Sequence, residues 1–189
     1  MKYIISILIL LALSTRTYAK KLYYPLEVVA GMADLIVVGE IESVNKGSYQ
    51  FKITKTVKGE EQGLIKVQMF KEWTCDHRMI KAEKGQKLFL FLNHKGGKYE
   101  IINGSTGEMF VEEGKVLITI NGNEPTVDEL ATSIQSFTKA FRLKNKDYEP
   151  FDENVFIQLI SEDEIKNLAK ESILTKWLFD KMKDYKIEK

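Results

Sequence analysis

Several features that commit a protein to one class are scarce in this sequence of 189 residues. It contains 3 prolines and 12 glycines, too few for a collagen-like or low-complexity chain. A single cysteine, Cys75, excludes an intrachain disulfide. The 28 basic and 27 acidic side chains nearly cancel, whereas binding to nucleic acid or an anionic membrane needs clustered Lys and Arg. We therefore expect a globular protein with no nucleic-acid partner.

Long hydrophobic runs are also lacking, because the apolar stretch at residues 4–13 is shorter than the about 20 residues of a membrane-spanning helix. Lys2 precedes this stretch, and Thr17 and Ala19 place small residues before a plausible cleavage point. This order is typical of a secretory signal peptide, here residues 1–19. Cleavage would remove Lys2 and Arg16 but no acid, changing the net charge from +1 to −1. We expect an exported protein, periplasmic or extracellular, with no transmembrane segment after cleavage.

Apolar residues make up 44% of the chain, and their spacing divides it near residues 122–125. In residues 20–122 they alternate or form short runs, which indicates strands. Residues 87–92 (KLFLFL) are apolar on both faces and should form a covered strand. Gly39 indicates a bulge or bend within the first strand. Seven short strands predict a small antiparallel barrel or sandwich, and their expected ranges are 34–44, 49–57, 64–70, 87–92, 99–102, 108–112 and 115–120.

Residues 123–189 have the period of helices and form the predicted helical extension. Thr126 and Glu129 have the spacing of a capping box at the start of a helix that ends near Arg142. A second box at Ser161 and Glu164 begins another helix, and residues 154–160 are a candidate for a further short one. The second helix has an expected inward stripe of Ile165, Leu168, Ala169, Ile173, Trp177 and Leu178. Because each helix has one apolar face, we expect them to pack on the barrel in one α+β domain.

Candidate chemical groups are few. Cys75, His77 and His94 are too few for a zinc site, which needs four good ligands. A thiol nucleophile at Cys75 would need a base and an oxyanion hole, and only His77 offers the first. No phosphate-binding, dinucleotide or metalloprotease motif occurs. We therefore predict no catalytic residue, no metal and no cofactor. The glycosylation sequon at Asn103 also fits a turn.

A family resemblance rests on four stretches: residues 33–41 (ADLIVVGEI), residues 57–59 (VKG), residues 73–75 (WTC) followed by Arg78, and residues 85–92 (GQKLFLFL). Together they resemble exported bacterial proteins with a tissue-inhibitor-of-metalloproteinases-like OB fold, in the netrin-like superfamily. The match covers about residues 33–120. It implies a five-stranded Greek-key barrel of the OB type with extra hairpin strands. Inhibitors of that superfamily place a disulfide-bonded N-terminal cysteine on the protease zinc, whereas the expected mature chain begins at Lys20.

The loop at residues 73–78 is the predicted binding surface, with Trp73, Cys75, His77 and Arg78 as its candidate residues. Arg78 could bind a carboxylate or stack on Trp73, and Trp73 could equally close the mouth of the barrel. Our first hypothesis is an exported, non-enzymatic binding module on an OB-type barrel, with a protein as a candidate partner. The alternatives are a thiol-dependent enzyme or redox protein using Cys75 and His77, and a protease inhibitor that acts through a loop.

Overall fold

The computed structural model describes residues 20–145 and 154–189. Its centre is a closed barrel in which the strands neighbour one another in the order β1-β2-β3-β5-β4-β1. The strands are β1 (Leu35–Asn45), β2 (Ser48–Lys58), β3 (Leu64–Gln68), β4 (Lys87–Lys95) and β5 (Lys98–Ile101). The predicted α+β fold with a small barrel is confirmed, and the barrel is compatible with the OB type. It is mixed rather than wholly antiparallel, because β3 and β5 pair in parallel.

Two more strands extend the sheet beside β4. The first, β6 (Glu108–Glu112), pairs with β4, and β7 (Lys115–Val116) pairs with β6. The turn between them contains Glu113 and Gly114, both with positive φ, as the tight turn of a hairpin requires. The strand predicted for residues 115–120 therefore ends early, at Val116.

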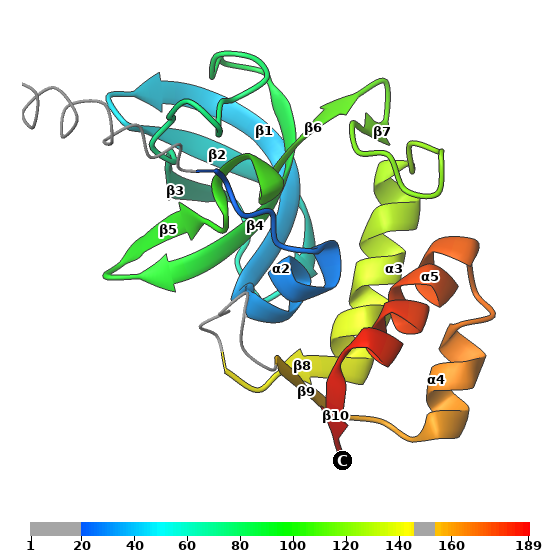
Figure 1. The fold of residues 1–189 in the computed structure, drawn as a ribbon. Coiled ribbons are helices and arrows are strands. Elements are labelled where there is room, and N and C mark those ends of the chain that lie inside the picture. Colours follow the sequence, from blue (N-terminus) through cyan, green and yellow to red (C-terminus); the bar gives the residue numbers. More distant parts are fainter. Residues whose placement is uncertain (1–19, 146–153) are drawn as a thin grey trace, which may run out of the picture.

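Helices and a small second sheet lie on one side of the barrel (Figure 1). A short helix, α2, precedes β1, and the remaining helices and strands follow β7. The helices are α2 (Leu26–Met32), α3 (Val127–Ala140), α4 (Glu162–Leu168) and α5 (Ile173–Lys181), with 3-10 turns η1 (Gly104–Thr106) and η2 (Met182–Asp184). The sheet contains β8 (Phe141–Leu143), β9 (Val155–Gln158) and β10 (Lys186–Glu188) in the order β10-β9-β8.

Helix α3 ends at Ala140, close to the predicted end near Arg142, and the chain continues directly as β8. The helical half differs from the prediction in two places. The expected short helix at residues 154–160 is wrong, because this segment contains β9. The expected second helix is divided into α4 and α5, and this break places Ile173 outward, 84% exposed. Both predicted capping boxes are present, at the starts of α3 and α4.

Alternation along the strands separates two apolar cores. Inside the barrel lie Leu35 and Val37 of β1 with Leu88, Leu90 and Leu92 of β4. The residues between them face the helices, where they join an apolar cluster with α2, α3 and α5; these residues are Ile36, Val38, Phe89 and Phe91. Strand β4 is therefore covered on both faces, as its apolar sequence predicted. We use the name helical layer for α2 to α5, β8 to β10 and the apolar cluster that they form with the outward-facing residues of the barrel.

Gly39 marks an irregularity in β1. The pairing of β1 with β2 shifts register between Val38 and Gly39, in agreement with the bulge or bend that the sequence predicted. A Cβ atom at this position would overlap the carbonyl oxygen of Lys52 on the neighbouring strand. Glycine is therefore required here by close backbone approach, and the bulge adds to the curvature that closes the barrel.

Candidate functional site

The predicted loop residues lie between β3 and β4, at one end of the barrel. Trp73 and Asp76 form an isolated antiparallel bridge, with nitrogen-to-oxygen distances of 3.1 and 2.9 Å in the two directions. Trp73 is 37% exposed. We call this end of the barrel, comprising residues 21–24, 73–80 and 103–110, the barrel mouth.

His77 is exposed, while Cys75 is partly buried. His77 Nε2 lies 3.2 Å from the carbonyl oxygen of Thr74, and Nδ1 lies 3.8 Å from a carboxylate oxygen of Glu72. A pair this far apart and this exposed contributes little to stability. His77 therefore presents its ring at the surface of the mouth.

Arg78 turns inward, and 2% of its side chain is exposed. Its Nη1 lies 3.1 Å from Oε2 of Glu108, whose side chain is 1% exposed. The same carboxylate oxygen accepts a hydrogen bond of 2.9 Å from the hydroxyl of Tyr49, which lies inside the barrel. The Arg78 guanidinium also lies 5.6 Å from the centroid of the Tyr49 ring. Arg78 thus binds a carboxylate and packs on an aromatic ring, as the sequence suggested, but the ring is that of Tyr49 and not the predicted Trp73.

Burial is the largest influence on the pKa values of Glu108 and Tyr49. It raises the pKa of Glu108 from its ordinary value, while Arg78 and Tyr49 lower it by a smaller amount. Burial also raises the pKa of Tyr49 well above its ordinary value, and the neighbouring Glu108 carboxylate raises it further. When Glu108 is ionised, its carboxylate has lost its contact with water, and the ion pair with Arg78 offsets part of that cost.

A second buried ion pair ties the N-terminal segment to the mouth. Lys21 Nζ lies 2.8 Å from Oδ1 of Asp76, and the two side chains are 4% and 7% exposed. Lys21 also donates a hydrogen bond of 2.8 Å to the hydroxyl of Ser105, whose backbone N–H donates to Asp76 at 3.1 Å. Gly104 packs directly on this carboxylate, since a Cβ atom there would overlap the Asp76 oxygens. Asp76 is thus fully engaged in positioning the loop.

Asn103 fixes the same N-terminal segment through its side-chain amide. The amide nitrogen donates to the carbonyl oxygen of Leu22 at 3.0 Å, and the amide oxygen accepts from the backbone N–H of Tyr24 at 3.3 Å. Asn103 adopts a left-handed conformation, with φ of 52°, which asparagine tolerates better than most residues. Residues 21–24 therefore lie across the mouth as an ordered segment.

A cavity of about 270 Å³ opens at the mouth. His77 and Arg78 line it, whereas Trp73 and Cys75 are not among its lining residues. Its polar wall also includes Ser105, Thr106 and Glu108. Its apolar wall is formed by Tyr23, Met79, Met109, Phe110, Leu117 and Ile118. The structure thus brings two of the four predicted residues to one concave surface.

Sequence reasoning missed most of the groups that build this surface, including Lys21, Tyr49, Thr106 and Glu108. One signal was present for Glu108: it is a charged residue at the start of a predicted strand whose other residues are largely apolar. A charge among apolar strand residues indicates either an exposed strand end or a buried pair, and only the fold identifies Arg78 as its partner.

Among residues 20–145 and 154–189, no group of three or more His, Cys, Asp or Glu side chains could hold a metal ion. In the same part of the chain, no helix is long and apolar enough to cross a membrane. Comparisons with protein-family models, with curated proteins and with solved structures gave no match to this chain.

Proposed function

We propose that this protein is an exported, non-enzymatic module that binds a partner protein at the barrel mouth. The observation that carries the proposal is the cavity of about 270 Å³, which combines an apolar wall with exposed apolar side chains at its edge. Two of its lining residues, Tyr23 and Met79, are 63% and 68% exposed. Exposed apolar groups beside a concave surface are typical of binding sites.

The distribution of exposed apolar side chains supports this location. In the described part of the chain, nine large apolar residues are exposed, and five of them belong to the barrel mouth. These five are Leu22, Tyr23, Trp73, Met79 and Ile80. Aromatic residues and methionine are enriched where proteins contact one another. Because they are concentrated at one end of the barrel and not scattered over the surface, they favour a contact site for a protein partner.

The mouth is also held in one conformation before a partner arrives. Lys21 and Asp76 fasten the N-terminal segment to the loop, and Arg78 and Glu108 fasten the loop to β6. A surface that is already ordered loses less conformational entropy on association. The two buried ion pairs therefore serve binding by preorganising the loop.

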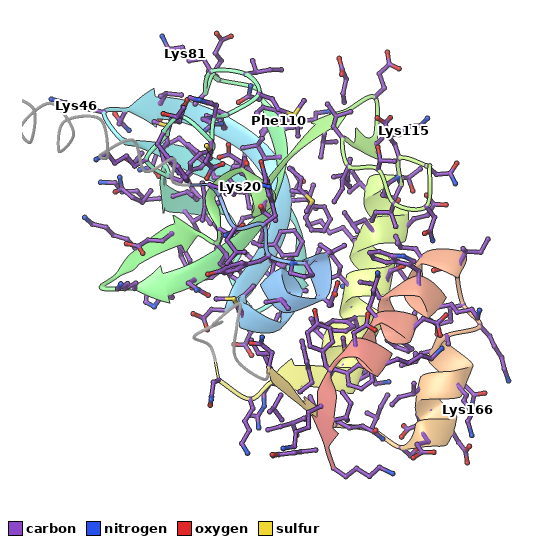
Figure 2. The ribbon with its side chains drawn as sticks, viewed as in Figure 1. Lys20, Lys46, Lys81, Phe110, Lys115 and Lys166 are labelled. Atoms are coloured by element: carbon purple, nitrogen blue, oxygen red, sulfur yellow. The ribbon has the colours of Figure 1, made fainter. Side chains whose placement is uncertain are left out.

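The proposal does not include a nucleic-acid partner, and the distribution of charge supports this choice. The chain has 28 basic and 27 acidic side chains. The lysines labelled in Figure 2 belong to different elements: Lys20 precedes α2, Lys46 lies in the turn after β1, Lys81 precedes β4, Lys115 lies in β7 and Lys166 in α4. Nucleic-acid binding needs Lys and Arg gathered on one face.

Export and family membership belong to the same proposal. Cleavage after Ala19 would leave Lys21 in the chain, available for its pair with Asp76. The closed barrel, with its order β1-β2-β3-β5-β4, supports membership in the netrin-like superfamily through its compatibility with the OB type. N-terminal sequencing of the protein recovered from an exporting bacterium tests the first point, with Lys20 as the expected first residue; retention of Met1 would contradict it.

The binding proposal is tested by selecting peptides from a display library on the purified protein and measuring their affinity by fluorescence anisotropy. Met79→Asp should weaken the selected peptides at least tenfold, because it places a charge in the apolar wall. Leu64→Asp is the matched control, since Leu64 is 56% exposed on β3, outside the mouth. Failure to enrich any peptide, or equal loss in both variants, would overturn the proposal.

Two further measurements separate the alternatives. Thiol chemistry at Cys75 requires a thiolate, so rapid reaction with a thiol reagent at pH 6 would favour the enzymatic hypothesis. Inhibition of members of a protease panel by the purified protein would favour the inhibitor hypothesis. The binding module predicts neither result.

A further inference from the structure

Three residues that line the mouth cavity carry buried polar atoms with no hydrogen-bond partner among the described residues. They are Arg78 Nη1, Thr106 Oγ1 and Glu108 Oε1. Nη1 of Arg78 lies near Glu108 Oε2, but this contact is an ion pair without hydrogen-bond geometry. Buried polar groups normally have partners, and each one left alone costs about 1–3 kcal/mol. Their convergence on one cavity indicates that something polar completes the site.

Two larger hollows lack this feature. One of about 400 Å³ lies between residues 120–125 and the start of α5, and an open one of about 560 Å³ lies beside α4 and β10. None of their lining residues is among those with a buried unpartnered polar atom in the described part of the chain. Of these three hollows in the described part of the chain, the mouth cavity is therefore the one whose lining indicates the chemistry of an occupant.

Charge and hydrogen bonding restrict the polar end of that occupant. Arg78 and Glu108 already neutralise each other, so an anion would compete with Glu108 and a cation with Arg78. Arg78 supplies a donor, Glu108 an acceptor, and the hydroxyl of Thr106 supplies both. A neutral group that both donates and accepts satisfies all three.

The apolar wall restricts the rest. A volume of about 270 Å³ exceeds the ~30 Å³ of one water severalfold and lies just below the range of drug-sized pockets. Met79 and Met109 both line it, and thioether sulfur makes favourable contacts with aromatic rings. A phenol combines a flat apolar ring with one hydroxyl, whereas the apolar stem of an asparagine or glutamine is smaller.

We infer that the mouth cavity receives a phenolic side chain, namely a tyrosine presented by the partner protein, whose hydroxyl is bound among Arg78, Thr106 and Glu108. This inference rests on the proposed binding function and names the group that the partner contributes. The exposed Tyr23 and Met79 at the edge of the cavity extend the contact surface beyond a single ring, which favours a protein over a small phenol.

The test uses p-cresol, the side-chain analogue of tyrosine, with methionine methyl groups as NMR reporters. The Met79 and Met109 resonances should shift on titration, while those of Met32 and Met182, which are buried in the helical layer, should not. Toluene, which lacks the hydroxyl, should bind about fivefold to tenfold more weakly. N-Acetyltyrosine amide should bind at least as well as p-cresol, and zwitterionic tyrosine more weakly, if a peptide-linked tyrosine is the ligand.

Thr106→Val isolates the polar contact without removing a charge. It should weaken p-cresol about fivefold, leave toluene binding unchanged, and leave Tm unchanged or higher, because the hydroxyl has no partner to lose. Thr132→Val, at an exposed position of α3, is the matched control and should change neither affinity.

Each outcome decides the inference. Toluene binding as tightly as p-cresol, or no effect of Thr106→Val, would overturn phenol recognition while leaving the proposed protein-binding function intact. An absence of shifts at Met79 and Met109 with every probe would overturn the cavity as a ligand site. Loss of peptide selection in the earlier experiment, with p-cresol still bound, would overturn the protein partner and retain a small-molecule phenol site.

Discussion

The barrel mouth and the helical layer both contain buried contacts, but these contacts are of different kinds. The helical layer is an apolar cluster with aromatic contacts such as Phe141 on Phe179, whose ring centroids lie 5.6 Å apart. The mouth instead buries two ion pairs, Arg78–Glu108 and Lys21–Asp76. Apolar packing is tolerant of local change, whereas a buried charge depends on one partner. The difference teaches that this fold places its charge-dependent contacts, whose strength varies with pH, where its cavity opens.

The strongest way to break this comparison is Arg78→Leu. It leaves Glu108 buried without its cation and should lower the free energy of unfolding by about 3–5 kcal/mol at pH 7. Burial already raises the pKa of Glu108, so the folded state takes up protons more readily than the unfolded one. The loss should therefore shrink as pH falls from 7 towards the ordinary range of a carboxyl group. Urea unfolding at several pH values measures it.

Two variants act as controls for that experiment. Phe156→Ala in the helical layer should cost about 3–5 kcal/mol with no such pH dependence, because it removes only apolar contacts. Adding Glu108→Leu to Arg78→Leu should restore part of the loss, since no charge then remains unpaired but the buried hydroxyl of Tyr49 loses its acceptor. A loss at Arg78→Leu that is constant with pH would show that packing, and not the charge on Glu108, sets the cost.

A smaller effect is expected from alanine in place of glycine. Gly104 has φ of +55° and faces Asp76 directly, so Gly104→Ala should cost more than the about 1–2 kcal/mol of a left-handed alanine alone. Gly114→Ala, with φ of +78° and nothing near its Cβ position, measures that conformational cost by itself.

Gly31→Ala in α2 should change stability by about 1 kcal/mol or less, because better helix propensity offsets contacts of 3.1 Å to Leu143 and Phe156. Thermal unfolding of the three variants should rank them in this order, and equal costs at Gly104 and Gly114 would contradict a role for the Asp76 contact.

The smallest effect concerns the start of α3. Thr126→Ala removes a cap and should cost about 1 kcal/mol. The N–H and hydroxyl of Thr126 both donate to the Glu129 carboxylate at 2.8 Å, and these bonds lower the pKa of Glu129. The stabilisation that the ionised Glu129 gives to the folded state is therefore present above pH 4.5, its ordinary pKa, and is lost as pH falls through the lowered pKa. This pH dependence is opposite in sign to that of Glu108, whose pKa is raised. Comparing wild type with Glu129→Gln across pH 2–7 tests this; a difference that grows as pH falls would contradict it.

The sequence predicted the barrel well because its strands carry local signals. Residues 87–92 have no polar face, and β4 is indeed covered by the barrel interior and by the helical layer. Gly39 indicated a bulge or bend because glycine within an apolar strand is typical of such sites. The capping boxes at Thr126 and Ser161 also act within four residues, so their prediction needed no tertiary information.

Features that depend on distant partners were missed. All seven residues of α2 are buried, so the segment has no polar face from which a helical period could be read. Strand β9 exists because it pairs with β8 and, in parallel, with β10, which lies about thirty residues later in the chain. At the mouth, Arg78 was identified from its neighbours in the loop, but its partner Glu108 and the ring of Tyr49 are 30 and 29 residues away along the chain. Only the closed barrel brings these side chains together.

The position of Asn103 has a practical consequence for producing this protein. Its side-chain amide, which a glycosylating host would modify in the sequence Asn-Gly-Ser, already holds Leu22 and Tyr24 by hydrogen bonds to their backbone. A sugar attached to that nitrogen would have to displace the donor bond to Leu22 or share the space beside it. Material made in yeast or mammalian secretory cells should therefore be compared with unglycosylated bacterial material before its N-terminal segment is assumed to be in place.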